Sequence, residues 1–188
     1  MNKLLASALF AAAATALAGC AASKEAKAAR EANPAPCPNI LILNDAARFI
    51  EFDGDQKAEN IAYTGEMVGV TSNCRYFAAE PINAGVTIDL AFGRGPKGGE
   101  KERKFTYFVA VTRKGAEVIA KKEFQVKVQF TDDKPIQVER VDIDRVHIPR
   151  AGENISGTNF EIVVGFSVTA EQAIFNRSGK SLKFPNLK

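Results

Sequence analysis

The chain has 188 residues, of which 46% are hydrophobic and 25% are charged, and its formal net charge is +3 with a single histidine. This composition is typical of a globular protein, and so small a charge argues against the strongly basic stripe of nucleic-acid-binding domains. One histidine also leaves too few ligands for the common zinc sites and the common catalytic triads.

The first 19 residues have the features of a signal peptide. Lys3 precedes the apolar run LLASALFAAAATA, which is too short for a comfortable transmembrane span. The run ends in Leu17-Ala18-Gly19-Cys20, which resembles the lipobox of bacterial lipoproteins. The resemblance implies that residues 1–19 are removed and that Cys20 becomes the lipidated first residue, a stable membrane anchor. Ordinary cleavage after Ala18, which would leave Cys20 as a free thiol, is the alternative.

Two features of the next segment bear on location and on domain boundaries. Cys20 is followed by Ala21, not by the Asp that commonly retains lipoproteins in the inner membrane. The resemblance therefore implies the periplasmic face of the outer membrane. Residues 20–36 contain no large apolar side chain, and Pro34 would end any helix there, so we expect a flexible tether. The folded domain is predicted to span residues 37–188.

The other two cysteines, Cys37 and Cys74, are expected to form a disulfide. An exported chain enters a compartment that permits disulfides, and with Cys20 lipidated two cysteines remain to pair. A redox role would need a CxxC motif or a neighbouring base, and the sequence has neither. We therefore predict a structural bond and no reactive thiol.

Strands are predicted wherever apolar and polar residues alternate. Residues 40–52 form a strand broken near Asn44-Asp45, although a helix over 45–52 is an alternative. Residues 61–72 change phase near Met67-Val68, as a bulged strand does. The remaining predicted strands are 86–92, the two arms of a hairpin over 104–130, an irregular edge strand over 136–148, and a strand over 158–169.

The hairpin over 104–130 is the most regular of these elements. Its inward positions are apolar on both arms, namely Phe105, Tyr107, Val109, Val111, Phe124, Val126, Val128 and Phe130. We expect these eight side chains to face the core. The opposite face carries Phe108 and Ala110, which are less polar than an exposed face requires. This indicates either a partner surface or a sheet that is covered on both sides.

The pattern as a whole predicts an all-β fold. About seven strands joined by short turns favour an antiparallel β-sandwich of the immunoglobulin or fibronectin-III type, with an up-and-down barrel as the alternative. The only helix expected is a short one over 170–177, where Thr169 and Gln172 fit a capping box.

Three sequence features could in principle bind a nucleotide or a metal or take part in catalysis. Residues 93–98 match GxGxxG, but a strand follows them where a dinucleotide site needs a helix, so we predict a loop at the end of a hairpin. The carboxylates at Asp53, Asp55 and Glu59, or at Asp142 and Asp144, are fewer than known calcium loops provide. His147 is predicted to be an exposed strand residue. No metal or cofactor is expected.

The loop that leads into the hairpin is the candidate partner-contact site. Its cations are Arg94, Lys97, Lys101, Arg103 and Lys104. Such a loop would suit the phosphates of lipopolysaccharide or an acidic partner. The alternative is a solvated hairpin end that keeps the sheet soluble.

The hairpin followed by VVGFSVTAEQAIFN is similar to small envelope lipoproteins of uncharacterised function with an immunoglobulin-like domain. The resemblance transfers no functional residue. We expect a non-enzymatic binding or accessory module of an envelope assembly, with the membrane and an envelope protein as partners and no nucleic acid. One alternative is a periplasmic receptor for a small ligand or lipid, which an apolar cavity between the sheets would favour. Another is a hydrolase, which would need two facing carboxylates.

Overall fold

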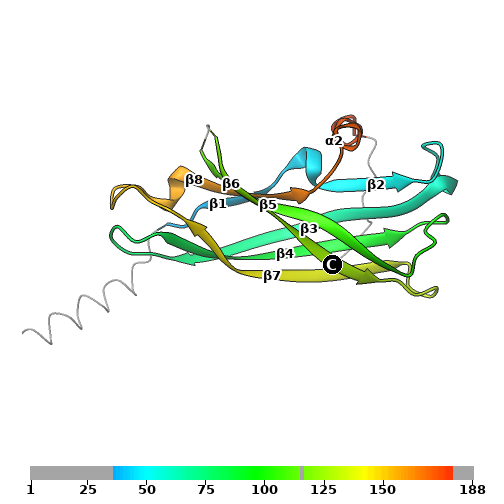
Figure 1. Cartoon of the computed structure of the whole chain (residues 1–188), viewed down its shortest axis with the longest axis horizontal. Coiled ribbons are helices and arrows are strands. Elements are labelled where there is room, and N and C mark those ends of the chain that lie inside the picture. The colour runs from blue at the N-terminus through cyan, green and yellow to red at the C-terminus, as the bar shows by residue number, and fades with distance from the viewer. Residues whose placement is uncertain (1–35, 115–116, 180–188) are drawn as a thin grey trace, which may run out of the picture. The chain divides into compact units, whose positions relative to one another are not determined.

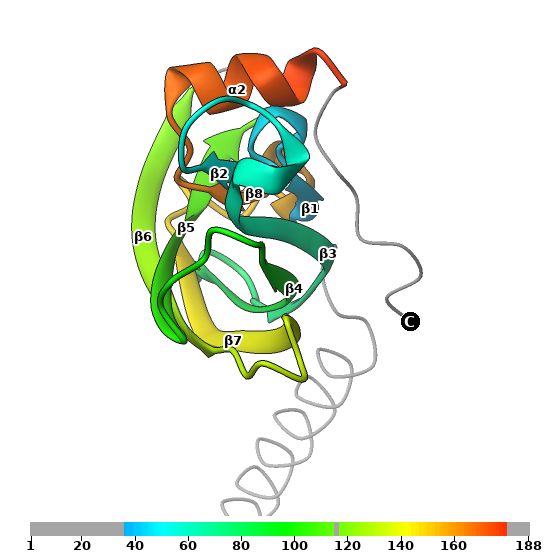
Figure 2. The same cartoon turned by 90° about the vertical axis from the view of Figure 1, so that its right-hand side faces the viewer.

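The computed structural model describes residues 36–114 and 117–179. The predicted signal peptide, Cys20 and the tether up to residue 35 lie outside these residues. The described chain forms two four-stranded sheets that pack face to face (Figures 1 and 2). The predicted β-sandwich is therefore confirmed.

The two sheets use strands from both halves of the sequence. The first sheet has the order β1 (Asn39–Ile42), β8 (Phe160–Phe166), β5 (Glu102–Arg113) and β6 (Val118–Gln129). The second has the order β2 (Arg48–Phe52), β3 (Ile61–Arg75), β4 (Ile82–Arg94) and β7 (Ile136–Ile148). The helical elements are the 3₁₀ turns η1 (Asn44–Ala46), η2 (Ala58–Asn60) and η3 (Gly157–Asn159), and the helix α2 (Ala170–Arg177). All pairings are antiparallel except that of β1 with β8.

The predicted first strand is two strands, one in each sheet, which is why the described residues hold eight strands where about seven were expected. The break falls at η1, where the sequence placed it. Before the turn, the amide of Leu43 donates to the carbonyl of Val164 in β8 (2.8 Å). After it, the carbonyl of Ala47 accepts from the amide of Met67 in β3 (2.9 Å). This segment thus ties the two sheets together along one side of the sandwich.

Two connections differ from the sequence prediction. Strand β4 begins at Ile82, four residues before the strand predicted over 86–92. Its neighbours are β3 and β7, whereas the following strand β5 belongs to the other sheet. Residues 95–101 therefore connect the two sheets and are not the end of a hairpin. The predicted bulge in β3 is confirmed by a register shift between Met67 and Gly69.

Phenylalanines form the centre of the core. The ring of Phe49 in β2 lies 5.0 Å from that of Phe166 in β8 and 5.3 Å from that of Phe105 in β5, measured between centroids. Phe92 in β4 stacks on Phe105 at 4.6 Å. These contacts join both sheets, and each aromatic pair contributes roughly 0.5–1.5 kcal/mol beyond its burial.

The hairpin of β5 and β6 presents the predicted apolar face to this core. Seven of the eight inward side chains are buried, namely Phe105, Tyr107, Val109, Val111, Val126, Val128 and Phe130. The eighth, Phe124, is half-buried. It lies where the two sheets separate at an open edge, so the packing around it is incomplete.

The opposite face of the first sheet is also covered locally. Phe108 and Ala110 are buried against Ala46 of η1, with Val163 and Val168 packed beside them. Of the two explanations offered for this apolar face, a sheet covered on both sides is the one that the structure shows.

Helix α2 completes this cover. The predicted capping box is present, because the Thr169 side chain accepts from the amide of Gln172 and the Gln172 side chain accepts from the amide of Thr169. The buried amide of Asn176 donates to the carbonyls of Asp45 (2.8 Å) and Arg48 (2.6 Å), which fixes the helix to η1. Among the described residues, no helix has the length and hydrophobicity that crossing a membrane requires.

Gly65→Ala is expected to destabilise the domain by about 2–3 kcal/mol. A Cβ atom at Gly65 would lie 2.1 Å from Cε1 of Phe49, so the central ring of the core would have to move. The control is Gly69→Ala on the same strand, where a Cβ would meet only Asp89, at 3.7 Å. That change should leave the free energy of unfolding within about 1 kcal/mol. Urea denaturation measures both, and equal midpoints would contradict the packing described here.

Candidate functional site

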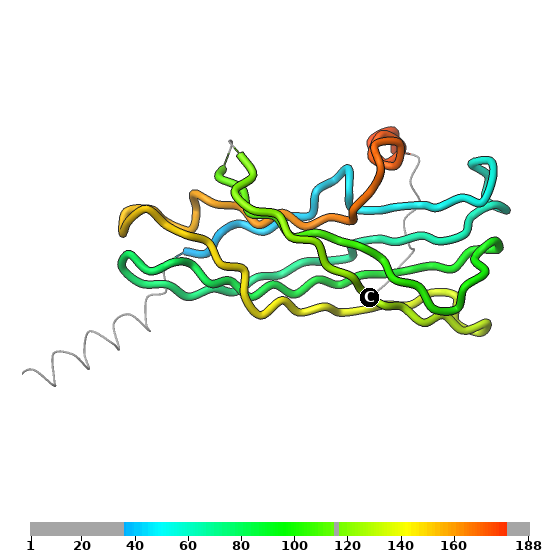
Figure 3. The backbone as a smooth tube through the Cα atoms, in the orientation of Figure 1, coloured from blue at the N-terminus to red at the C-terminus, as the bar shows by residue number. Residues whose placement is uncertain are grey.

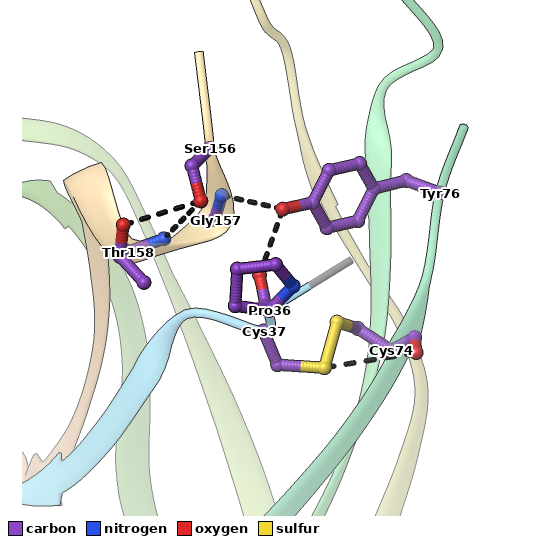
Figure 4. Close-up of a disulfide and its surroundings, with 7 residues drawn as sticks. All are labelled: Pro36, Cys37, Cys74, Tyr76, Ser156, Gly157 and Thr158. Atoms are coloured by element: carbon purple, nitrogen blue, oxygen red, sulfur yellow. Dashed lines mark hydrogen bonds between the residues drawn. A yellow bond between two sulfur atoms is a disulfide. The ribbon is translucent and has the colours of Figure 1, made fainter. Parts of the chain in front are cut away.

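Cys37 and Cys74 form a disulfide with their Cα atoms 5.7 Å apart, as predicted. The bond lies beside Pro36, the first described residue (Figure 4). The described chain begins at one end of the sandwich (Figure 1). Beside it, the hydroxyl of Tyr76 donates to the carbonyl of Pro36 (2.7 Å) and accepts from the amide of Gly157 (2.6 Å). Pro36, the first described residue, is thereby joined to the end of β3 and to η3.

Arg150 organises the loops at the same end. Its guanidinium lies 4.3 Å from the centroid of the Tyr76 ring and donates to carbonyls in two loops. These carbonyls belong to Phe77, Ala78, Glu80 and Ile155. With its donors bound to carbonyls of its own domain, Arg150 has a structural role.

The candidate partner-contact loop is largely engaged with its own domain. Arg94 and Lys101 each bind one carboxylate oxygen of Asp132 at 2.7 Å. Hydrogen bonds from Lys101 and Arg94 lower the pKa of Asp132 to about 2. These two cations therefore fix the loop to the segment before β7.

The remaining cations of this loop fall into two classes. Arg103 binds Glu51 of β2 at 2.6 Å and stacks on the Tyr63 ring at 4.3 Å. The pKa of Glu51 is raised because its burial outweighs the charge of Arg103. Lys97 and Lys104 are exposed, and neither forms a salt bridge with a described residue. The structure does not bring the five predicted residues together into one free cationic patch.

The glycines of the GxGxxG match have a packing role. A Cβ atom at Gly95 would lie 2.2 Å from the carbonyl oxygen of Ile61, at the start of β3. The residue must therefore be small, because backbone lies against backbone there. The match connects strands β4 and β5, and no helix begins at it, so the geometry of a dinucleotide site is absent from this described segment.

A cleft of about 230 Å³ opens between β6 and β7, which are the edge strands of the two sheets. Its apolar lining comes from three strands and comprises Val109, Val111, Ala120, Phe124, Ile143 and Val146. Phe124 is held in place because it stacks on Tyr107, with the ring centroids 5.5 Å apart. The cleft is thus an unfilled continuation of the core at the open side of the sandwich.

The polar groups that line this cleft are Lys121, Lys122, Arg145 and His147, and no carboxylate is among the lining residues. The ammonium of Lys121 lies 4.6 Å from the Phe108 ring, on the outer face of the sheet. That of Lys122 lies 5.2 Å from the Phe124 ring, on the inner face. Within the described part of the chain, neither Lys122 nor Arg145 forms a salt bridge. The mouth of the cleft is therefore positively charged.

Sequence reasoning missed this site, although one signal for it was present. The alternation that predicts Phe124 and Val126 to face the core also places Lys122 on that face, two residues earlier. A lysine that shares the inward face of a strand with apolar residues indicates that the core ends at that position. Arg145 gave no such signal, because it lies where the pairing of β7 with β4 shifts register.

A second, more open groove lies on the outer face of the first sheet and contains Asp45 and Glu123. Both carboxylates already have partners. Arg177 binds Asp45 and lowers its pKa, and Glu123 accepts from the hydroxyl of Ser167 at 2.9 Å. Both carboxylates of this groove are therefore engaged by side chains of their own domain.

Two of the carboxylates considered as calcium ligands interact with other side chains of the domain. Asp55 lies 3.5 Å from the ammonium of Lys57, and Asp142 accepts from the hydroxyl of Thr87 at 2.5 Å. No group of three or more potential metal ligands occurs within residues 36–114 and 117–179. His147 is exposed, with its Nδ1 3.2 Å from the side-chain oxygen of Asn83.

The sequence matches no protein-family model, and no curated protein matches it significantly. The similarity to bacterial lipoproteins thus stays with the sequence patterns around Cys20 and in the hairpin.

Proposed function

We propose that this protein is a bacterial lipoprotein, anchored through Cys20 to the periplasmic face of the outer membrane, whose sandwich is a non-enzymatic binding module in an envelope assembly. The observation that carries the proposal is the Cys37–Cys74 disulfide. Disulfides persist in exported proteins and are rare in the cytosol. This one joins Cys37, one residue after the first described residue, to the end of β3.

The geometry of the described domain supports a module with two distinct ends. The disulfide and the first described residues lie at one end, and the connection from β4 to β5 lies at the other (Figure 3). Lys97 in that connection and Lys104 at the start of β5 are exposed cations that form no salt bridge with a described residue. They are the part of the predicted partner-contact loop that remains available to an acidic envelope protein.

Cys20→Ser is expected to abolish lipidation. Wild-type protein should incorporate an alkyne-labelled fatty acid and sediment with membranes, whereas the variant should show no label and should be released or accumulate as precursor. Ser23→Ala, outside the lipobox, is the matched control and should be labelled like the wild type. Absence of label from the wild type would refute the anchor.

A second candidate function is favoured by the cleft between β6 and β7. The alternative is a periplasmic receptor for a small ligand or lipid, and the apolar side chains that line this open cleft at the edges of the two sheets support it. The two functions are compatible, because an anchored module can carry a ligand site on its side.

A further inference from the structure

We propose that the cleft between β6 and β7 binds a single-chain anionic amphiphile, with its apolar chain between the sheets and its acidic head group at Lys122 and Arg145. This inference rests on the receptor function proposed above and names its ligand class. The shared chemistry is one acyl chain that ends in a carboxylate or a phosphate.

The lining of the cleft accounts for the chain. Val109 and Val111 of β5 form its floor, and Phe124, Ile143 and Val146 stand at the two edges. The last three are only half-buried, so apolar surface there is still in contact with water. Removing that surface from water drives binding of an apolar group without any specific polar contact.

The size of the cleft restricts the ligand to a narrow one. Its volume of about 230 Å³ is below the roughly 300–1,000 Å³ of sites that enclose a whole drug-sized molecule. It exceeds the roughly 150 Å³ of an engineered apolar cavity that holds benzene. The cleft therefore takes part of one chain, and the head group must stay outside at the mouth.

The charges at the mouth account for the head group. Lys122 and Arg145 approach from opposite edges and form no salt bridge within the described part of the chain. No carboxylate lines the cleft to neutralise them. Carboxylate and phosphate oxygens accept charge-assisted hydrogen bonds from both side-chain types. A neutral or cationic amphiphile would leave these donors unused.

Lys122 has a simpler possible role, because inward-pointing charges on edge strands prevent sheets from pairing with one another. That role explains neither Arg145 nor the apolar surface behind the two cations. It also predicts a different phenotype: Lys122→Gln would then promote self-association and leave the affinity for an amphiphile unchanged.

The test uses the mature chain, residues 20–188 carrying Cys20→Ser, which lacks both the apolar leader and the lipid. It is titrated with lauric acid, dodecyl phosphate and dodecanol below their micellar concentrations. At least one anion should bind at least about tenfold more tightly than dodecanol. Lys122→Gln and Arg145→Gln should each weaken that anion by about threefold to tenfold and leave dodecanol unchanged. Ala120→Trp, which fills the cleft from its edge, should abolish binding of all three.

The matched control is Lys127→Gln, on the same strand but paired with Glu102 on the outer face, which should bind like the parent. A preference for laurate or for dodecyl phosphate identifies the head group. Failure of both anions to bind, or binding unaffected by Ala120→Trp, overturns the inference. The fatty-acid labelling of Cys20 is independent of this result, so loss of the ligand site and loss of the anchor are distinguishable.

Discussion

Val128→Asp is expected to unfold the domain. The Val128 side chain is 0% exposed on the inner face of β6. The change removes about 1.5–3 kcal/mol of apolar burial and adds about 3–5 kcal/mol for a buried charge without a partner. The sum is comparable with the whole stability of a typical domain, about 5–15 kcal/mol. Circular dichroism should show loss of the sheet signal at room temperature, or a strongly lowered Tm.

Gln125→Asp is the matched control for this experiment. Gln125 lies on the same strand but is exposed, opposite Thr106 of β5. A surface substitution of this kind usually changes stability by no more than about 0.5 kcal/mol. Similar melting temperatures for the two variants would mean that β6 does not bury one face, and the sandwich would lose its main support.

Removal of the disulfide is expected to have the second largest effect. In the double variant Cys37→Ser and Cys74→Ser, the unfolded chain is no longer closed into a loop across a sequence separation of 37. The chain-entropy model gives a loss of about 4 kcal/mol. For a domain of this size that loss lowers the Tm by roughly 10 °C. Wild-type protein treated with a reductant should melt at the same temperature as the double variant.

Tyr76→Phe provides an internal check on that result. The Tyr76 hydroxyl binds Pro36 and Gly157, next to the disulfide. Its loss leaves a buried amide unpaired and should cost about 1–3 kcal/mol when the disulfide is intact. Without the disulfide, Pro36 is no longer held in place, so the cost should be smaller. Strict additivity of the two changes would show that they do not hold the same segment.

Alternation in the sequence was sufficient to predict most strands and their buried faces. It places Phe105 and Val126 inward because successive side chains on a strand point to opposite sides. It carries no information about which strand lies next to which. The separation of β4 and β5 into different sheets, and the parallel pairing of β1 with β8, therefore could not be predicted.

Charge patterns in the sequence were less informative about the site. Arg94 and Arg103 looked available, but their partners Asp132 and Glu51 lie 38 and 52 residues away in the chain. The cleft has the same property, since Lys122 and Arg145 come to line one cleft only after the two sheets have packed. A cation without an acidic neighbour in the sequence stays unpaired in the protein only if the fold brings no distant carboxylate to it.

The disulfide at the start of β1 also determines how the domain would carry a mechanical load. A pull on Pro36 passes through the bond at Cys37 directly into Cys74, near the end of the 15-residue strand β3, where it pairs with Ala84 of β4. Strand β1, which has only four residues and one neighbour, is bypassed. Reduction would transfer the force to β1 and its hydrogen bonds with β8. In the oxidised protein, tension at this end is therefore resisted by a covalent path into the long strand β3.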